Sequence, residues 1–152
     1  MSGNVIAESG DNFDIARWQS DDAIKACLGM RRIAMVGLSS NTARPSNQVA
    51  QYLLARGYAV IPVNPQESMI MGLESYPDLA SIPFTIDLVD VFRDSAAVPQ
   101  IARDAVAIGA KGLWLQLGVI SQEGVQIASE AGLTCIMDRC PKIELAKLTS
   151  AA

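Results

Sequence analysis

A polar loop over residues 36–47, with the sequence V-G-L-S-S-N-T-A-R-P-S-N, carries groups that bind phosphate. A hydrophobic run precedes the loop, and a helical pattern that begins near Ser46 follows it. Free backbone N–H groups at the start of a helix attract anions. We expect Ser46 to be the N-cap, so that the N–H groups of Asn47 and Gln48 point into a ligand crevice. Candidate phosphate ligands surround this helix start, namely Ser39, Ser40, Thr42 and Arg44.

The loop keeps one glycine, Gly37, where a dinucleotide-binding fold places G-x-G-x-x-G. The second and third glycines of that fingerprint let the backbone approach a pyrophosphate and pack the helix against the strand. The corresponding positions here carry side chains, so the loop does not match a dinucleotide site. An ordinary strand-to-helix turn is the alternative interpretation, because Ser, Asn, Thr and Pro are common in turns.

A second hydrophobic run ends at Asn64 and Pro65, where an NAD site carries an acidic residue that binds the ribose 2′-hydroxyl. A neutral Asn and a flat Pro tolerate a phosphorylated ribose, which occurs in coenzyme A (CoA) and in NADP. The pattern therefore disfavours NAD and does not separate the other two ligands. A strand end stopped by proline is the alternative interpretation.

Apolar runs of strand length alternate with segments of helical period, which is typical of a parallel sheet with helices on both faces. We expect strands over residues 32–36, 58–63, 86–92, 112–117 and 134–137. We expect helices over residues 20–29, 46–56, 98–108, 123–131 and 141–148, with a short one over 77–81. Residues 1–16 are expected to form a flexible N-terminal tail, and residues 17–152 a single domain.

These elements predict an α/β protein with a Rossmann-like three-layer α/β/α fold and about five parallel strands. Right-handed crossovers and the precedent of nucleotide-binding folds favour the strand order 3-2-1-4-5. That order places a ligand crevice at the carboxyl ends of strands one and four. The loops that would line it are residues 37–46 and 64–65, Arg93, and residues 116–119.

Composition and charge argue against several classes of protein. Hydrophobic residues make up 50% of the chain, yet no uncharged apolar run approaches the roughly 20 residues that span a bilayer. The net charge of −4, from 12 basic and 16 acidic residues, and the lack of a basic run do not fit a nucleic-acid binder. The N-terminus lacks the basic start and apolar core of a signal peptide, so we expect a cytoplasmic location.

Few side chains in this sequence can do chemistry. The chain has no histidine, which removes the commonest general base and nitrogen metal ligand. Three cysteines, Cys27, Cys135 and Cys140, form no C-x-x-C pair, so neither a disulfide framework nor a zinc site is expected. Asp87 and Asp90 fall on opposite faces of a strand and do not suggest a metal site. We expect no catalytic residue and no metal, and leave open whether the protein is an enzyme.

Five segments of the chain resemble a known family, the stand-alone CoA-binding proteins. They are A-M-V-G-L-S with R-P-S, V-A-Q-Y-L-L-A-R-G-Y-A-V-I-P-V-N-P, D-L-V-D-V-F-R, L-W-L-Q-L-G-V and M-D-R-C-P-K-I-E, within residues 20–148. The Rossmann-like domain of this family is similar to the CoA-binding domain of the succinyl-CoA synthetase α subunit. The phosphohistidine and the ATP-grasp partner domain of that synthetase have no counterpart in this sequence, so ligase activity does not transfer.

The resemblance implies that CoA lies across the carboxyl ends of the strands, with its phosphates near the first loop. Family members often read K-x-E-H near the C-terminus, whereas this chain has Leu145 in place of that histidine. Carried over by position, the resemblance implies that the phosphate loop is lined by Gly37, Ser39 and Ser46, and that Arg44 pairs with a phosphate. It implies that the adenosine is bordered by Asn64 and Pro65, with a third wall formed by Phe92 and Arg93. The residues that would approach the pantetheine are Gln116, Leu117 and Gly118.

Cys140 lies in the sequence D-R-C-P, between the last expected strand and the last expected helix. Thiolates are favoured at helix N-termini and beside cations such as Arg139, so this residue is a candidate for a mixed disulfide with the CoA thiol. The alternative, which the sequence alone favours, is a small residue buried beneath the C-terminal helix.

The sequence therefore predicts a non-catalytic binding module for CoA or an acyl-CoA, and a regulatory role is one option. The options for a protein partner are a second copy of the chain, in a homodimer, and an acyl-CoA enzyme. A small NAD(P)-dependent oxidoreductase is one alternative. The missing glycines, the neutral residue at Asn64 and the lack of a Tyr-x-x-x-Lys pair count against it. An interaction protein with a vestigial nucleotide pocket is the other.

Overall fold

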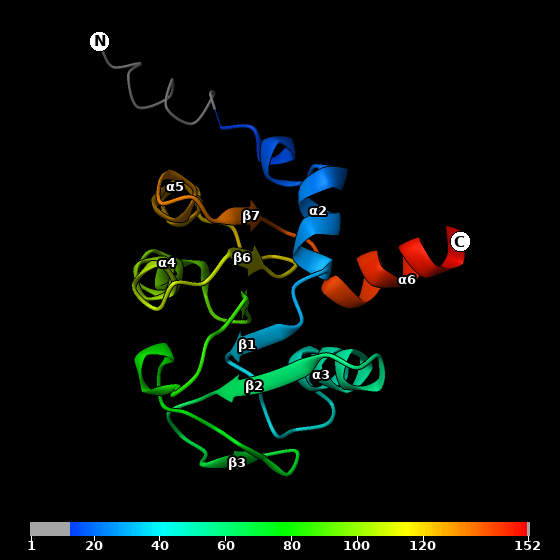
Figure 1. The fold of residues 1–152 in the computed structure, drawn as a ribbon, viewed down its shortest axis with the longest axis vertical. Coiled ribbons are helices and arrows are strands. Elements are labelled where there is room, and N and C mark those ends of the chain that lie inside the picture. Colours follow the sequence, from blue (N-terminus) through cyan, green and yellow to red (C-terminus); the bar gives the residue numbers. More distant parts are fainter. Residues whose placement is uncertain (1–12, 152) are drawn as a thin grey trace.

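The computed structural model describes residues 13–151, which form a parallel five-stranded sheet between two layers of helices (Figure 1). In chain order the parallel strands are β1 (Arg32–Val36), β2 (Ala59–Val63), β5 (Leu88–Val91), β6 (Gly112–Leu115) and β7 (Thr134–Ile136). Every residue of β5 and β6 is buried. Burial on both faces of the sheet explains why these strands are continuous apolar runs rather than alternating patterns. The expected strands are confirmed to within two residues at each end.

Helices cover both faces of the sheet (Figure 1). On one face lie α2 (Asp21–Leu28), α3 (Pro45–Ala55) and α6 (Pro141–Ala151), and on the other lie α4 (Val98–Ala107) and α5 (Gln122–Glu130). Successive strand residues point to opposite faces, so Met35 packs beneath the first group and Ala34 beneath the second. The predicted three-layer α/β/α class is therefore confirmed. Among the described residues, no helix has the length and apolar character that crossing a membrane requires.

The order of the strands differs from the expected 3-2-1-4-5. It is β2-β1-β5-β6-β7, which is 2-1-3-4-5 when only the parallel strands are numbered. β5 pairs directly with β1, with Val91 opposite Val36. The predicted order was wrong, and the point where the strand order reverses lies between β1 and β5 instead of between strands one and four.

The connection from β2 to β5 accounts for this order. It contains a hairpin of β3 (Met69–Ile70) and β4 (Leu73–Glu74) followed by the 3-10 helix η2 (Leu79–Ser81). Leu79 and Ile86 belong to the core beneath α4 and α5, on the opposite face from α3, and Tyr76 packs against that core. Because crossovers are right-handed, a connection on that face carries the chain back past β1. Hydrophobic spacing does not show which face a connection follows, so the sequence could not decide the order.

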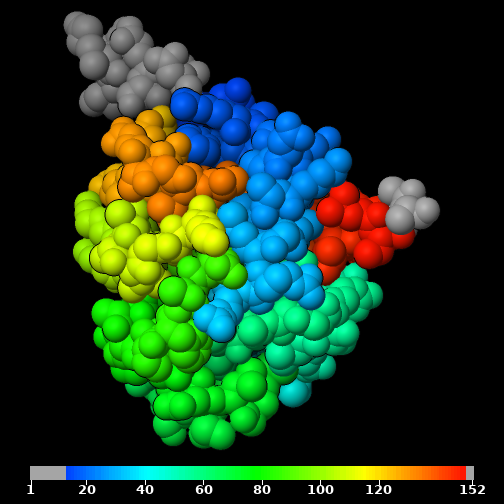
Figure 2. Space-filling view, viewed as in Figure 1, coloured from blue at the N-terminus to red at the C-terminus, as the bar shows by residue number. Residues whose placement is uncertain are grey.

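The N-terminal boundary of the domain lies earlier than expected. Residues 1–12 of the expected tail lie outside the described residues, but Phe13 and Ile15 pack against the core. The short 3-10 helix η1 (Ile15–Trp18) follows, and the carbonyl of Trp18 accepts a hydrogen bond from the Met137 N–H at 3.0 Å. Figure 2 shows this N-terminal segment and α2, in blue, against the orange and red C-terminal third. Residues 13–16 therefore belong to the domain.

Candidate functional site

Two pockets open at the carboxyl ends of the parallel strands, and both are lined by Gly37 and Arg93. The first, which we call the Asn64 pocket, has a volume of about 420 Å³ and is lined by Val36, Gly37, Val63, Asn64, Pro65, Gln66, Pro77, Asp78, Leu79, Arg93, Ile101 and Asp104. The second, the Cys140 pocket, has a volume of about 400 Å³ and is lined by Gly37, Ser39, Arg44, Pro45, Ser46, Val49, Phe92, Arg93, Asp94, Gln116, Leu117, Val119 and Cys140. Both volumes are typical of small-molecule sites.

Gly37 stands where three strand ends converge. Its N–H donates a hydrogen bond to the carbonyl of Val63 at 2.9 Å, which ties β1 to β2. Its φ angle is +93°, and a Cβ atom there would lie 2.7 Å from the carbonyl oxygen of Phe92 and 3.1 Å from Cδ of Arg93. Glycine is required because both the backbone conformation and the approach of the β5 end exclude a side chain. The single glycine of the loop thus serves strand convergence at the boundary between the pockets.

The helix after this loop starts one residue earlier than expected. Arg44 is the N-cap of α3 and Pro45 is the first helical residue, a position that suits proline because it needs no N–H donor. The N–H groups of Asn47 and Gln48 both donate to the carbonyl of Arg44. The expectation that Ser46 caps the helix and leaves those two N–H groups free was therefore wrong.

Polar side chains hold the first loop in place. The hydroxyl of the buried Ser46 accepts a hydrogen bond from the Ser39 N–H at 3.1 Å. Asn47 donates through Nδ2 to the Ser39 carbonyl at 2.9 Å. From the second loop, Asn64 donates through Nδ2 to the Leu38 carbonyl at 3.0 Å. Oδ1 of Asn64 accepts a hydrogen bond from the Gln66 N–H at 2.8 Å. The amide of Asn64 therefore links the loops after β1 and β2.

Most of the residues expected to bind a ligand lie around the two pockets. The Asn64 pocket includes Gly37, Asn64, Pro65 and Arg93. The Cys140 pocket includes Gly37, Ser39, Arg44, Ser46, Phe92, Arg93, Gln116, Leu117 and Cys140. Ser40, Thr42 and Gly118 line neither pocket. The corrected strand order makes this clustering tighter, because the loop after β5 lies directly beside the loop after β1.

Two arginines supply positive charge to the pockets. Arg44 and Arg93 are exposed, and neither forms an ion pair with any of residues 13–151. Arg93 stands at the boundary of the two pockets, and Arg44 borders the Cys140 pocket. An unpaired guanidinium is well suited to bind phosphate through two parallel hydrogen bonds.

Acidic residues of the Asn64 pocket were missed by the sequence analysis. Oδ1 of Asp78 accepts hydrogen bonds from the N–H and hydroxyl of Ser81, as the N-cap of η2. Oδ1 of Asp104 accepts from Nε2 of Gln100 on the same helix. The D-L-A-S pattern at 78–81 signals a helix cap, but nothing local places it at a pocket. Asp104 reaches the pocket because α4 follows β5, and that placement required the correct strand order.

Two buried polar side chains lack partners among the described residues. Gln116 is 5% exposed, lines the Cys140 pocket, and its Oε1 accepts no hydrogen bond. Asp90, in the middle of β5, is fully buried and neither carboxylate oxygen has a partner. Burial without hydrogen bonds raises the pKa of Asp90 well above its ordinary value, because the ionised form is poorly solvated. Asp90 lines neither pocket, whereas Gln116 borders the site.

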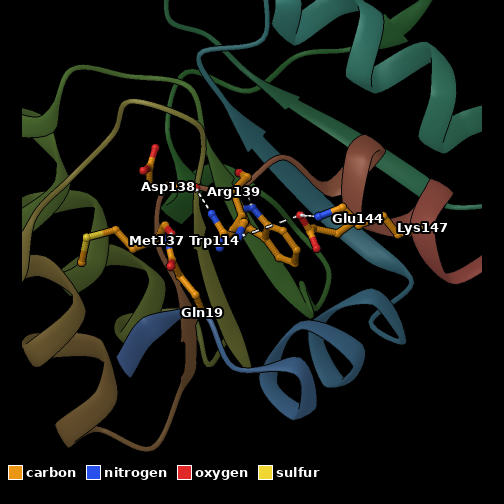
Figure 3. Close-up of polar contacts among 7 residues, drawn as sticks. All are labelled: Gln19, Trp114, Met137, Asp138, Arg139, Glu144 and Lys147. Carbon is orange, nitrogen blue, oxygen red and sulfur yellow. Dashed lines mark hydrogen bonds and ion pairs between the residues drawn. The ribbon is translucent and has the colours of Figure 1, made fainter. Parts of the chain in front are cut away.

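The turn between β7 and α6 is fixed by a group of polar contacts (Figure 3). Asp138 has a φ angle of +59°, and its Oδ1 accepts a hydrogen bond from the Gly118 N–H at 2.7 Å. Nε1 of Trp114 donates to the carbonyl of Arg139 at 2.8 Å. The guanidinium of Arg139 lies 3.9 Å from Glu144, which also pairs with a lysine of α6. Gly118 therefore supports the site through this turn instead of lining a pocket.

Comparison with known proteins identifies relatives of the chain. The model of a protein family described as CoA binding domain matches residues 31–146. An uncharacterized protein of Bacillus subtilis, YneT, is 38% identical over 113 residues, which cover 74% of this chain and 84% of YneT. The region that matches the family contains both pockets completely, since every residue that lines them falls between 36 and 140.

A solved structure shares this fold, and one segment of a larger enzyme is similar in sequence. The structure of a hypothetical protein from Pyrococcus horikoshii has a TM-score of 0.84 and 33% identity, covering 91% of this chain and 98% of that one. The ADP-forming acetate–CoA ligase II of Archaeoglobus fulgidus is 26% identical over 96 residues. That match covers 62% of this chain but spans 14% of the ligase.

Proposed function

This chain belongs to the CoA binding domain family, and from that membership we propose that it is a binding module for CoA or an acyl-CoA. The observation that carries the proposal is the pair of pockets that meet at Gly37 and Arg93. CoA has an adenosine end, a central pyrophosphate and a long pantetheine arm that ends in a thiol. A cleft of two lobes with a cation at their boundary suits a ligand of that shape and charge.

We assign the adenosine end to the Asn64 pocket. Pro65 offers a flat apolar surface to a base, and the carboxylates of Asp78 and Asp104 can accept hydrogen bonds from amino and hydroxyl groups. The same carboxylates repel a phosphate held deep in this pocket. The ribose 3′-phosphate is therefore directed outward in this arrangement, toward solvent and the arginines.

The pyrophosphate then lies at the boundary between the pockets, next to Arg93 and within reach of the loop that carries Arg44. The pantetheine arm follows into the Cys140 pocket, where Phe92, Leu117 and Val119 provide apolar surface. Gln116 supplies a buried hydrogen-bond acceptor without a partner among the described residues, and the amide N–H groups of pantetheine are suited to it.

We further propose that the module is non-catalytic and acts beside an acyl-CoA enzyme. The similar segment of the acetate–CoA ligase is one part of a longer enzyme, which supports a role for such a domain in presenting or sensing CoA. The cysteines at 27, 135 and 140 are free thiols, in keeping with the reducing cytoplasm that we propose as the location.

Calorimetric titration of the purified protein with CoA, acetyl-CoA, dephospho-CoA, NAD and NADP tests the proposal. We expect CoA and acetyl-CoA to bind and NAD to give no signal.

Arg93→Ala should weaken the binding of CoA and of dephospho-CoA alike, by roughly tenfold to a hundredfold, because a charge-assisted contact to the shared pyrophosphate is lost. Arg44→Ala should do the same if it pairs with the pyrophosphate, and should spare dephospho-CoA if it pairs with the 3′-phosphate.

Arg103→Ala is the matched control, since Arg103 is a surface arginine that pairs with Glu123 at 3.5 Å and lines neither pocket. Its affinity for CoA should equal that of the unchanged protein. A preference for NADP over CoA would instead support an oxidoreductase. Silence toward every nucleotide would contradict the proposal and favour an interaction protein.

A further inference from the structure

Cys140 occupies a position that the proposed function does not explain. The residue is 7% exposed and lines the Cys140 pocket, directly before Pro141 at the start of α6. The thiol therefore stands at the N-terminal end of an 11-residue helix, inside the wall of a pocket. The buried side chain that the sequence alone favoured is thus also part of a pocket wall.

A second group in the same pocket points independently to a ligand. Gln116 is 5% exposed, and its Oε1 has no hydrogen-bond partner among residues 13–151. A buried amide oxygen of this kind is costly unless a ligand or water supplies a donor. Gln116 and Cys140 line one pocket together, so a ligand that fills this pocket lies against both residues.

Two hydrogen bonds hold the backbone of Arg139, the residue before Cys140, and Figure 3 shows the one from Trp114. The carbonyl of Arg139 accepts from Nε1 of Trp114 at 2.8 Å, and the N–H of Arg139 donates to the Leu115 carbonyl at 3.3 Å. The guanidinium of Arg139 is directed to Glu144 of α6. The position of the thiol is therefore fixed by the fold rather than by a flexible loop, which favours reaction with a ligand of one geometry.

The other two thiols, those of Cys27 and Cys135, differ from that of Cys140 because they lie outside both pockets. Cys27 and Cys135 are 0% and 5% exposed and line neither pocket. Burial raises the pKa of Cys27 to about 12 and that of Cys135 to about 12, so both stay protonated at neutral pH. They serve as internal controls for reactivity within the same chain.

We propose that Cys140 is a modification site that captures CoA as a mixed disulfide, an inference that rests on the proposed binding of CoA. The Cys140 thiol gives its proton to solvent, and its sulfur attacks one sulfur of a CoA-containing disulfide. A bond forms between the Cys140 sulfur and the first CoA, the original S–S bond breaks, and the second thiol leaves as a thiolate that takes up a proton. The oxidising equivalent comes from the disulfide co-reactant.

Intact-protein mass spectrometry after incubation with CoA disulfide tests this proposal, with peptide mapping to locate the adduct. We expect one CoA per chain at Cys140, none at Cys27 or Cys135, and release of the adduct by a reductant. Formation should be at least about tenfold faster than with glutathione disulfide, because binding raises the local concentration of the reagent. Acetyl-CoA, which lacks a free thiol, should slow the reaction by competing for the pocket.

Cys140→Ser and Cys140→Ala should each abolish the adduct. Calorimetry under reducing conditions should show that both variants still bind CoA, which separates this inference from the proposed function. Binding of CoA without an adduct would overturn the inference and leave the binding function intact. An adduct that forms equally fast with glutathione disulfide would also overturn it, because the pocket would then contribute nothing.

Discussion

At the scale of single residues, Gly37 combines two constraints. Its φ of +93° is unfavourable for other residues, and the carbonyl oxygen of Phe92 occupies the space that a Cβ atom needs. We expect Gly37→Ala to lower the free energy of unfolding by roughly 2 to 4 kcal/mol, from backbone strain together with separation of the ends of β1 and β5. Urea denaturation measures this loss.

Gly109→Ala is the control for Gly37, because Gly109 has a φ of +77° and nothing lies within 4 Å of the position that its Cβ atom would take. Strain alone should cost about 1 to 2 kcal/mol there. Equal losses for the two variants would show that the approach of Phe92 is unimportant.

Asp90 is a carboxyl group whose folded-state pKa lies above its unfolded value, since burial disfavours the ionised form. Its folded form binds a proton more tightly, so the protein loses stability as the pH rises above the ordinary pKa of aspartate. The loss continues up to the folded-state pKa, at about 1.4 kcal/mol per pH unit at most. Asp90→Asn should therefore be more stable than the unchanged protein at pH 7, by a margin that shrinks toward pH 4.

Thermal denaturation of both proteins across pH 4 to 8 measures the effect of Asp90→Asn. Asp87→Asn is a useful comparison, because Asp87 accepts a hydrogen bond from the Arg32 N–H and lies 3.8 Å from Lys111. It should show no such gain at neutral pH. A margin that did not change with pH would mean that Asp90 is already ionised in the folded protein.

At the scale of elements, the sequence predicted the strands and helices of the site but not the way they join. The apolar runs located β1, β2, β5, β6 and β7 because buried parallel strands leave a strong local signal. Pro45 at the first helical position shifted the start of α3 by one residue and left Ser46 to bond Ser39. Such side-chain contacts between loops depend on tertiary structure, so spacing along the chain does not reveal them.

The link between the loops after β1 and β2 depends on the amide of Asn64. Asn64→Asp keeps the Oδ1 acceptor but replaces the Nδ2 donor with an oxygen that faces the Leu38 carbonyl. We expect a loss of about 1 to 3 kcal/mol in the free energy of unfolding, from a lost hydrogen bond and repulsion between oxygens. Chemical denaturation at pH 7 measures it.

Asn41→Asp is the matched control for Asn64→Asp. Asn41 is exposed, and its Oδ1 accepts from the Ala43 N–H at 2.9 Å in an arrangement that an aspartate preserves. Its stability should change by less than about 0.5 kcal/mol. The titrations then separate two roles for Asn64: similar losses of CoA and dephospho-CoA affinity indicate a structural link, and a greater loss for CoA indicates a phosphate nearby.

At the scale of the whole molecule, hydrophobic content and the alternation of elements were enough to predict the three-layer class. These two features of the sequence could not predict the order of the strands or the N-terminal boundary of the domain. Both depend on which face a segment covers: η2 packs on the face of α4, and Trp18 bonds the end of β7. The Asp104 side of the Asn64 pocket depended on the same information, so the site was predicted less completely than the fold.

Occupation of the two pockets by one ligand should stabilise the domain as a unit, because their walls come from the ends of β1, β2, β5 and β6 and from the start of α3. At a CoA concentration one hundred times the Kd, binding adds about 2.7 kcal/mol to the free energy of unfolding. For a domain of this size that raises the melting temperature by roughly 5 to 10 °C. NAD at the same concentration should leave it unchanged.

Hydrogen exchange can then locate the ligand within the molecule. CoA should slow exchange in the loops at residues 37–46, 64–66, 92–94 and 116–119, each of which contributes residues to the wall of at least one pocket, and should leave the β3–β4 hairpin at 69–74 unaffected. Protection confined to the loops around Asn64 would mean that only the nucleotide end is held. In that case a short nucleotide such as ADP should raise the melting temperature as much as CoA does, and the Cys140 pocket would need a different ligand.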